Sequence, residues 1–382
     1  MDDARPGPRV AHGSAGPGSG PVPGPATHSP MPSRRLRPIL LALLAACAPT
    51  GEPGIPSAPP HLVEQPSGTT ELLQAVSVVD RDVVWVSGHG GTYARTTDGG
   101  ATWRAAMVPG ADTLQFRDVH ARDARTAWLL AAGPADMSRI YRTDDAGATW
   151  ILQWTNPEPD GFYDCLEFWD DRRGIAYGDA VGGTLRIQRT EDGGATWRRV
   201  PDDALPAALP GEGGFAASGL CVETAPGGRA RIAAGNTSAA RVFRTDDYGR
   251  TWRAAEVPVE TGEGAGLTAI SMIDSRHGFA FGGSLGVTDR ATRNVVRTED
   301  GGATWTALPA LSFPGAAYGG LAIPAADGRA LLAVGPGGAA VSLDAGATWT
   351  TLDSRAWWAA GSAGPAATWI TGPDGRIARV AW

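Results

Sequence analysis

The sequence predicts an all-β protein built from repeated four-stranded units. The nine residues RTEDGGATW occur at positions 189–197 and recur unchanged at 297–305. Four looser copies bring to six the occurrences of Ser/Thr-x-Asp-x-Gly-x-Thr-Trp, whose tryptophans are 44 to 55 residues apart. A period in the forties fits a four-stranded propeller blade better than a helical repeat. No segment shows a sustained helical period of apolar residues. We therefore predict a β-propeller.

The N-terminal 60 residues are not expected to belong to this fold. Residues 1–30 are rich in Pro, Gly, Ala and Ser, which predicts disorder ahead of a true start at Met31. Residues 31–47, MPSRRLRPILLALLAAC, combine an Arg cluster, a short apolar run and small residues, the layout of a secretory signal. LAAC, ending at Cys47, resembles a bacterial lipobox, whose cysteine is lipidated; an ordinary signal with an incidental cysteine is the alternative. Residues 48–60, rich in proline, would form a tether.

These features predict where the protein resides. A lipid on Cys47 would anchor an exported chain to the bacterial cell envelope without a membrane-spanning helix. Ala48 follows the cysteine in place of the aspartate associated with retention in the inner membrane. We therefore expect an exported lipoprotein, with the outer membrane favoured, that contacts the membrane only through this anchor.

The first repeat shows where the motif lies within a blade. Four strand-like runs, residues 75–80, 83–88, 92–97 and 102–106, alternate with Asp, Gly and Ser, so the motif joins the third strand to the fourth. Its Asp can accept bonds from backbone N–H groups, its Gly tolerates positive φ, and its Trp buries a large ring between sheets. We assign this turn-forming role, rather than catalysis or metal binding, to Asp98, Trp103, Asp145, Trp150, Asp192, Trp197, Asp247, Trp252, Asp300, Trp305, Asp344 and Trp349.

The chain end determines the number of blades. Three more strand-like runs, residues 355–362, 367–373 and 375–382, follow the sixth motif and leave a blade one strand short. The run HLVEQP at 61–66 resembles an outer strand and can complete that blade, which removes an exposed edge. The sequence thus predicts a single domain, residues 61–382, with seven blades of four antiparallel strands, the last closed by the N-terminal strand. We expect it to be a monomer.

Two cysteines, Cys165 and Cys221, fall in the innermost strands of neighbouring blades. They could pair outside the cytoplasm, but we favour free buried thiols, because neighbouring blades usually hold such strands too far apart for disulfide geometry. The cysteine spacing matches no common zinc site, so no metal is expected.

Charge and motifs exclude several classes of function. The formal net charge is −7, every basic residue of the chain is Arg, and these form no basic stripe, which argues against nucleic-acid binding. The glycine-rich runs lack the following helix of a dinucleotide site, and no haem or iron–sulfur pattern occurs. We therefore expect no cofactor.

Candidate binding residues lie on the face opposite the motifs. Two long connections, residues 154–164 and 201–218, flank the third blade, and long loops on a rigid scaffold often carry function. Alignment of the inner strands places five side chains at equivalent positions near the channel mouth: Gln74, Arg117, Asp164, Ser218 and Thr268. We predict a recognition surface built from Arg117, Asp160, Tyr163, Asp164, Asp179 and Glu212. The alternative is a structural Arg117–Asp164 ion pair surrounded by turn residues.

The repeat resembles the Asp-box, or BNR, repeat, and residues 60–382 resemble the photosystem II assembly factor family (the Ycf48/Hcf136-like group). FRDVHA, FYDCLEFWDDRRGIAYGD and the repeated RTxDGGATW carry that resemblance. It implies a seven-bladed, non-catalytic scaffold that binds a membrane or exported protein. The photosystem client is not implied, because nothing here indicates a thylakoid and no Arg-rich face is evident.

The competing interpretation is a glycan-binding or glycoside-hydrolysing propeller. Sialidases share the box, but this sequence has no Arg-Ile-Pro signature before the first copy. Asp164 and Glu167, three apart on one strand, would point to opposite faces and make a poor acid/base pair. Box-containing xyloglucanases use two propellers and are much longer. We therefore favour a binding scaffold over an enzyme.

Overall fold

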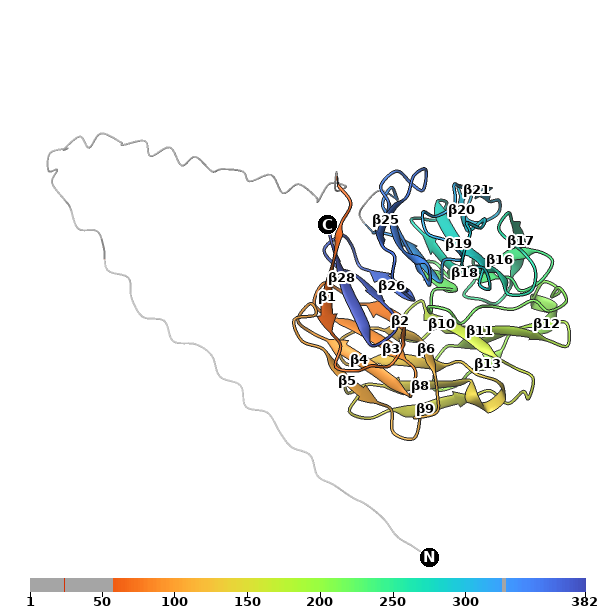
Figure 1. Ribbon diagram of the computed structural model, residues 1–382. Coiled ribbons are helices and arrows are strands. Elements are labelled where there is room, and N and C mark those ends of the chain that lie inside the picture. Colours follow the sequence, from red (N-terminus) through yellow and green to blue (C-terminus); the bar gives the residue numbers. More distant parts are fainter. Residues whose placement is uncertain (1–23, 25–57, 325–327) are drawn as a thin grey trace, which may run out of the picture. The chain divides into compact units, whose positions relative to one another are not determined.

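A computed structural model describes residue 24, residues 58–324 and residues 328–382. From residue 58 onward these form seven four-stranded antiparallel sheets arranged around a ring, which confirms the predicted seven-bladed propeller (Figure 1). The signal at 31–47, its Cys47, most of the tether and nearly all of residues 1–30 lie outside the described residues. In the part that is described, no helix is long and apolar enough to cross a membrane.

In blades one to six, the innermost strand comes first in the chain and the strands follow outward in order. Blades one to three comprise β2 (Leu73–Val78), β3 (Val84–Gly88), β4 (Thr92–Thr96), β5 (Arg104–Met107); β6 (Phe116–Ala121), β7 (Ala127–Ala131), β8 (Arg139–Thr143), β9 (Ile151–Thr155); and β10 (Tyr163–Phe168), β11 (Gly174–Val181), β12 (Thr184–Thr190), β13 (Arg198–Arg199). Blades four to six comprise β14 (Val222–Ala225), β15 (Arg229–Ala234), β16 (Ala240–Thr245), β17 (Arg253–Val257); β18 (Ala265–Met272), β19 (Gly278–Ser284), β20 (Val295–Thr298), β21 (Thr306–Ala307); and β22 (Gly319–Ala322), β23 (Leu331–Gly335), β24 (Gly338–Ser342), β25 (Thr350–Asp353). Two short 3₁₀ turns, Ala135–Met137 and Asp202–Ala204, interrupt the connections.

The seventh blade is closed by the first strand, as predicted. Its order is β1 (His61–Pro66), β28 (Arg376–Ala381), β27 (Thr368–Thr371) and β26 (Ala359–Ser362), and β1 lies along β28 (Figure 1). Gln65 of β1 also joins this blade to the first, because its Oε1 accepts hydrogen bonds from the indoles of Trp103 and Trp369, each at 3.0 Å. One amide side chain thus ties the two ends of the ring together.

The repeated motif forms the turn between the third and fourth strands of blades one to six. Asp98 Oδ1 accepts bonds from Thr102 N at 2.8 Å and Thr96 Oγ1 at 2.7 Å, and its Oδ2 accepts from Thr102 Oγ1 at 2.6 Å. These bonds, chiefly those from Thr102, lower the pKa of Asp98 to about 2. Gly100 has φ +84° and a Cβ there would lie 2.0 Å from Gln65 Oε1, so only glycine fits.

The five other copies repeat the same bonds. In each, the Asp side chain accepts from the Thr two residues earlier, or Ser342 in the last copy, and from the backbone and hydroxyl of the Thr four residues later: Asp145, Asp192, Asp247, Asp300 and Asp344. The motif tryptophans are half-buried or, at Trp252 and Trp305, buried. The motif carboxylates therefore form turns, as the sequence indicated.

The core lies between successive blades rather than at one centre. Apolar side chains of adjacent sheets pack face to face, and four tryptophans are fully buried among them: Trp85, Trp128, Trp357 and Trp369. Because each blade is buried by its two neighbours, the ring holds the connections at both ends of the central channel in fixed positions.

The expectation of free thiols is wrong, because Cys165 and Cys221 form a disulfide. Their Cα atoms are 6.0 Å apart, within the range that a disulfide spans. The innermost strands converge toward the channel axis, so neighbouring blades come closest there. Cys165 lies in β10 and Cys221 directly precedes β14, and the bond therefore links blades three and four.

Candidate functional site

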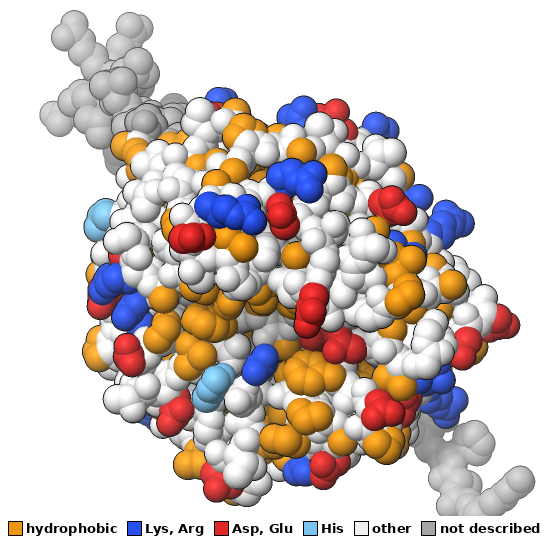
Figure 2. Space-filling view, turned by 45° about the vertical axis from the view of Figure 1, so that its right-hand side comes forward, with side chains coloured by type: hydrophobic (Ala, Val, Ile, Leu, Met, Phe, Trp, Pro, Cys, Tyr) orange, Lys and Arg blue, Asp and Glu red, His pale blue; other side chains and the backbone are white. Residues whose placement is uncertain are grey.

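A pocket of about 240 Å³ lies at the mouth of the central channel, on the face opposite the motif turns. We call it the mouth pocket, and it is lined by Leu72, Gln74, His89, Arg117, Phe215, Ala216, Ala217, Leu285, Tyr318 and Trp358. These residues come from the starts of inner strands, from turns between second and third strands, and from the long 201–218 connection. Figure 2 shows a hollowed face on which apolar side chains gather, with one histidine and one basic side chain at one edge of the hollow and acidic side chains at the other.

Arg117 supplies the positive charge of the mouth pocket. Its guanidinium donates through Nε and Nη2 to Gln115 Oε1, and it forms no ion pair with a carboxylate among the described residues. Burial lowers the pKa of Arg117, and the nearby Asp164 partly opposes this shift. The anticipated Arg117–Asp164 ion pair is therefore not formed, although the two side chains are near enough to influence each other.

Gln74 and His89 form a second polar contact in the pocket. Gln74 Oε1 lies 2.6 Å from His89 Nε2, and the Gln74 Nε2 group donates to no other described residue. Burial, and then the charge of Arg117, lower the pKa of His89, while Glu71 raises it. His89 is therefore held in its neutral form near pH 7 and adds no positive charge to that of Arg117.

The inner-strand alignment is reproduced for four of its five residues, while Ser218 lies in the connection ahead of β14. Gln74, Arg117, Asp164 and Thr268 each lie at a register shift between the first and second strands of their blades. A β-bulge re-aims the side chain at the point where it occurs. Of the five aligned residues, Gln74 and Arg117 line the mouth pocket, whereas the hydroxyls of Ser218 and Thr268 donate to the carbonyls of Tyr318 and Ala317.

Asp164 and Asp179 form a buried carboxyl pair beneath the connection that lines the pocket. Asp179 Oδ1 accepts the N–H of Gly214 at 3.0 Å, and Asp164 Oδ2 has no hydrogen-bond partner among the described residues. A Cβ on Gly213 would lie 1.9 Å from Asp179 Oδ1, so glycine is needed for this close approach. Burial raises the pKa of Asp164 well above its usual range and that of Asp179 to about 6.

The other three residues of the predicted surface lie apart from the mouth pocket. Tyr163 is fully buried, and its hydroxyl accepts a bond from Gln188. Glu212 is buried in a bidentate ion pair with Arg241, which fixes the 201–218 connection on blade four. Asp160 is exposed in the other long connection. Of the six predicted residues, only Arg117 therefore lines the mouth pocket; Asp164 lies near enough to act on its pKa, and Asp179 is paired with Asp164.

Carboxyl groups deeper in the ring hold backbone N–H groups that no sheet partner satisfies. Asp118 Oδ2 accepts the N–H of Leu166 at 2.7 Å, and both carboxyl oxygens of Glu223 lie 2.8 Å from the N–H of Met272. Burial raises the pKa of Glu223 to about 8. These acids therefore join neighbouring blades. In the described part of the chain, no group of three or more His, Cys, Asp or Glu side chains could hold a metal ion.

Stability is expected to fall as the pH rises from 5 to 8.5. Asp179 and Glu223 have raised pKa values in the folded chain, so they stabilise it fully below about pH 4 and progressively less as pH passes 6 and then 8. Each unit of pKa shift is worth about 1.4 kcal/mol, which predicts a combined loss on the order of 5 kcal/mol across this range. Urea unfolding across this range should show the decline, flattened by Asp179→Asn below pH 7 and by Glu223→Gln above it. The exposed Asp160→Asn variant should follow the parent, and a flat parent curve would contradict the assignment.

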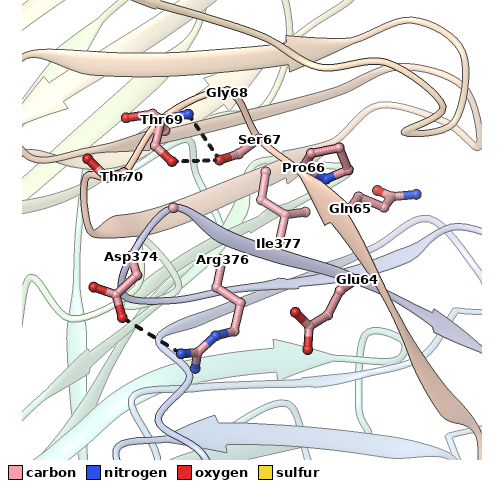
Figure 3. A pocket seen from close by; sticks show the side chains of 11 residues that line it. Glu64, Gln65, Pro66, Ser67, Gly68, Thr69, Thr70, Asp374, Arg376 and Ile377 are labelled. Atoms are coloured by element: carbon pink, nitrogen blue, oxygen red, sulfur yellow. Dashed lines mark hydrogen bonds and ion pairs between the residues drawn. The ribbon is translucent and has the colours of Figure 1, made fainter.

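A larger and shallower pocket of about 590 Å³ lies at the seam between β1 and the β27–β28 turn (Figure 3). Its polar groups bind one another: Ser67 Oγ contacts Thr69, and Arg376 lies 3.9 Å from Asp374 and donates to Ala356 O. The charged side chains that line the seam pocket are therefore paired with described residues, Glu64 with Arg355 and Arg376 with Asp374, and the pocket results from the closure of the ring. The mouth pocket is the better candidate site.

Sequence reasoning missed the apolar walls of the mouth pocket. Leu72, Tyr318 and Trp358 precede three inner strands, and the rings of Tyr318 and Trp358 meet edge to face at 4.9 Å. The sequence signal for these walls was an aromatic residue directly before an inner strand, as at Tyr318 and Trp358. The alternation of apolar and polar residues that predicts strands does not indicate that such a residue lines a pocket.

Comparison with known proteins gives similarity of fold. No family model and no curated protein sequence matches the chain. A solved structure described as YCF48 bound to D1 peptide is 16% identical, with a TM-score of 0.58 over 86% of this chain and 99% of that one. YCF48 from Cyanidioschyzon merolae is 17% identical, with a TM-score of 0.59 over 84% and 99%.

An enzyme shares the architecture over part of its length. The GH74 xyloglucanase from Xanthomonas campestris is 15% identical, with a TM-score of 0.55 over 83% of this chain but only 53% of its own. The two YCF48 structures, in contrast, are matched along nearly their whole length. The comparisons therefore confirm the fold inferred from the sequence: this chain is a seven-bladed β-propeller similar in fold to the YCF48 structures.

Proposed function

We propose that this protein is a non-catalytic assembly scaffold that binds a protein partner through the face carrying the mouth pocket. The observation that carries the proposal is the composition of that pocket. Half-buried apolar and aromatic walls surround one arginine that no carboxylate of the described residues pairs with. Apolar pockets with a few placed polar groups are typical of binding sites.

The carboxyl groups nearby do not favour hydrolysis. Asp164 is 2% exposed, and Asp179 accepts a backbone N–H, so the pair supports the pocket wall instead of facing a substrate. Glycoside hydrolysis requires two accessible carboxyl groups on either side of the scissile bond. The solved YCF48 structure described with a D1 peptide adds support for a protein partner. The lipobox-like run that ends at Cys47 supports a partner in the cell envelope.

A glycan ligand is the second candidate. The edge-to-face aromatic pair Tyr318–Trp358 in the pocket and the similarity of fold to a xyloglucanase favour it. The match to only about half of that enzyme, together with the burial of Asp164, makes it the weaker of the two.

Site-specific photo-cross-linking in the native cell envelope tests the proposal. A benzophenone amino acid at Leu285, in the pocket wall, is expected to capture a discrete protein, whereas the same group at the exposed Ile151 of outer strand β9 should not. Arg117→Gln should reduce the yield at Leu285 at least fivefold. Equal capture from both sites, or none from either, would reject the docking face and move the search to xyloglucan binding and hydrolysis.

A further inference from the structure

The mouth pocket is built to accept a negatively charged group. Arg117 lies in its wall, and among the described residues its guanidinium bonds to the neutral Gln115 alone. Asp164, the carboxyl group that acts on the pKa of Arg117, is itself held toward its protonated form by burial and by Asp179. The free Nε2 of Gln74 adds a second donor. A planar guanidinium with unused N–H groups binds a carboxylate through two parallel hydrogen bonds.

The walls determine how a ligand enters. Lining residues come from blades one, two, five, six and seven and from the connection between blades three and four, so the walls surround the channel axis and the pocket opens toward the solvent. A chain passing across the face would need an entrance and an exit between these walls. A chain entering along the axis needs only one opening, and its end then lies in the pocket.

The volume and the apolar lining of the pocket indicate the size and chemistry of the terminal residue that it can hold. About 240 Å³ accommodates a carboxylate with little more than one side chain. Leu72, Phe215, Leu285 and Trp358 present apolar surface that is only half-buried in the free protein. An apolar side chain attached to the carboxylate would cover this surface while Arg117 pairs with the charge.

We propose that the mouth pocket binds the free C-terminal carboxylate of an extended peptide whose last side chain is apolar. The inference rests on the proposed function and specifies its ligand. Arg117 holds the carboxylate, Gln74 donates to it, and Leu285 and Trp358 contact the last side chain. Specificity for a free chain end follows, since a C-terminal amide carries no negative charge to pair with the guanidinium of Arg117.

Matched peptides test the proposal directly. The probes are acetyl-Gly-Ser-Gly-Ala-Leu and its Val and Phe analogues, each made with a free carboxylate and as the amide, and measured with the full chain by saturation-transfer NMR. Charge-assisted hydrogen bonds to buried partners contribute about 1.5–3 kcal/mol, so the acids should bind at least about 10-fold more tightly than the amides. Arg117→Gln should abolish this preference, and Arg117→Lys should retain part of it. Arg290→Gln is the matched control, because it removes an exposed Arg from the same face outside the pocket.

Three results would overturn the proposal: equal binding of acid and amide, no binding of any probe at 1 mM, which is about −4.1 kcal/mol, or an unchanged preference in Arg117→Gln. Binding of acetyl-Gly-Glu-Gly-Ala-Leu-amide as tightly as the free acid would assign the pocket to internal acidic side chains and overturn it equally. Melting curves establish that each variant is folded. If the peptides fail while Leu285 still captures a protein in the envelope, docking stands and only the C-terminal mode is rejected; loss of both removes the proposed function.

Discussion

Deletion of β1 is expected to destabilise the ring by more than about 5 kcal/mol. β1 pairs with β28 over six residue pairs, from His61–Ala381 to Pro66–Arg376. Each backbone hydrogen bond contributes about 0.5–1.5 kcal/mol net, and an indole N–H left unsatisfied costs about 1–3 kcal/mol. Loss of Gln65 would leave two such groups, on Trp103 and Trp369. Because a single domain is stable by only 5–15 kcal/mol, this loss is a large part of the total.

Guanidinium unfolding of a chain that begins at residue 67 measures this effect, and a chain that begins at residue 58 is the control. The shorter chain should also associate through the exposed edge of β28, which size-exclusion chromatography would detect. A synthetic peptide of residues 58–68 should restore part of the stability. A second variant, Gln65→Met, keeps the strand but removes the bonds to both indoles, and it should cost about 2–3 kcal/mol. Equal stability of the two truncated chains would show that β1 does not close the ring.

Replacement of Cys165 and Cys221 by alanine is expected to cost up to about 4 kcal/mol. The two residues are 56 positions apart, and a cross-link that closes a loop of this length removes a large part of the conformational entropy of the unfolded chain. Both cysteines are fully buried, so the bond joins blades three and four in the interior. The free energy of unfolding should therefore fall while the native fold persists.

Unfolding with and without a reductant measures the contribution of the disulfide. The parent chain should lose stability when dithiothreitol is present, whereas Cys165→Ala/Cys221→Ala should be equally stable in both conditions. Thiol titration in denaturant should find two more thiols in the parent after reduction than before. If the count is unchanged by reduction, the disulfide is absent and the two residues are free thiols.

The motif turns and the closure of the ring could be predicted from the sequence because their causes are local or countable. In each turn, Asp, Thr and Gly contact one another within six residues, so the hydrogen bonds of Asp98 follow from the order of the letters. Each of the six motif copies marks one blade. The three strand-like runs after the last copy and the early run at 61–66 supply the four strands of a seventh, so the number of blades follows without knowledge of any long-range contact.

The candidate site depended on distances that the sequence does not contain. Arg117, Asp164 and Asp179 were identified from aligned inner strands and turns, and they do lie near one another. Tyr163 and Glu212 lie in the same segments, but one packs in the core and the other binds Arg241. The difference is the direction of each side chain, which is set by the bulge in β10 and by the path of the 201–218 connection.

The sequence by itself determined the all-β class, the repeat, the number of blades and the role of the motif carboxylates. Only the tertiary structure decided that Cys165 and Cys221 are paired, that Arg117 has no acidic partner among the described residues, and that Phe215, Tyr318 and Trp358 share one pocket. The physical reason is the geometry of a ring. Each blade is specified by its own residues, but the contents of the channel mouth depend on how closely seven blades approach a common axis.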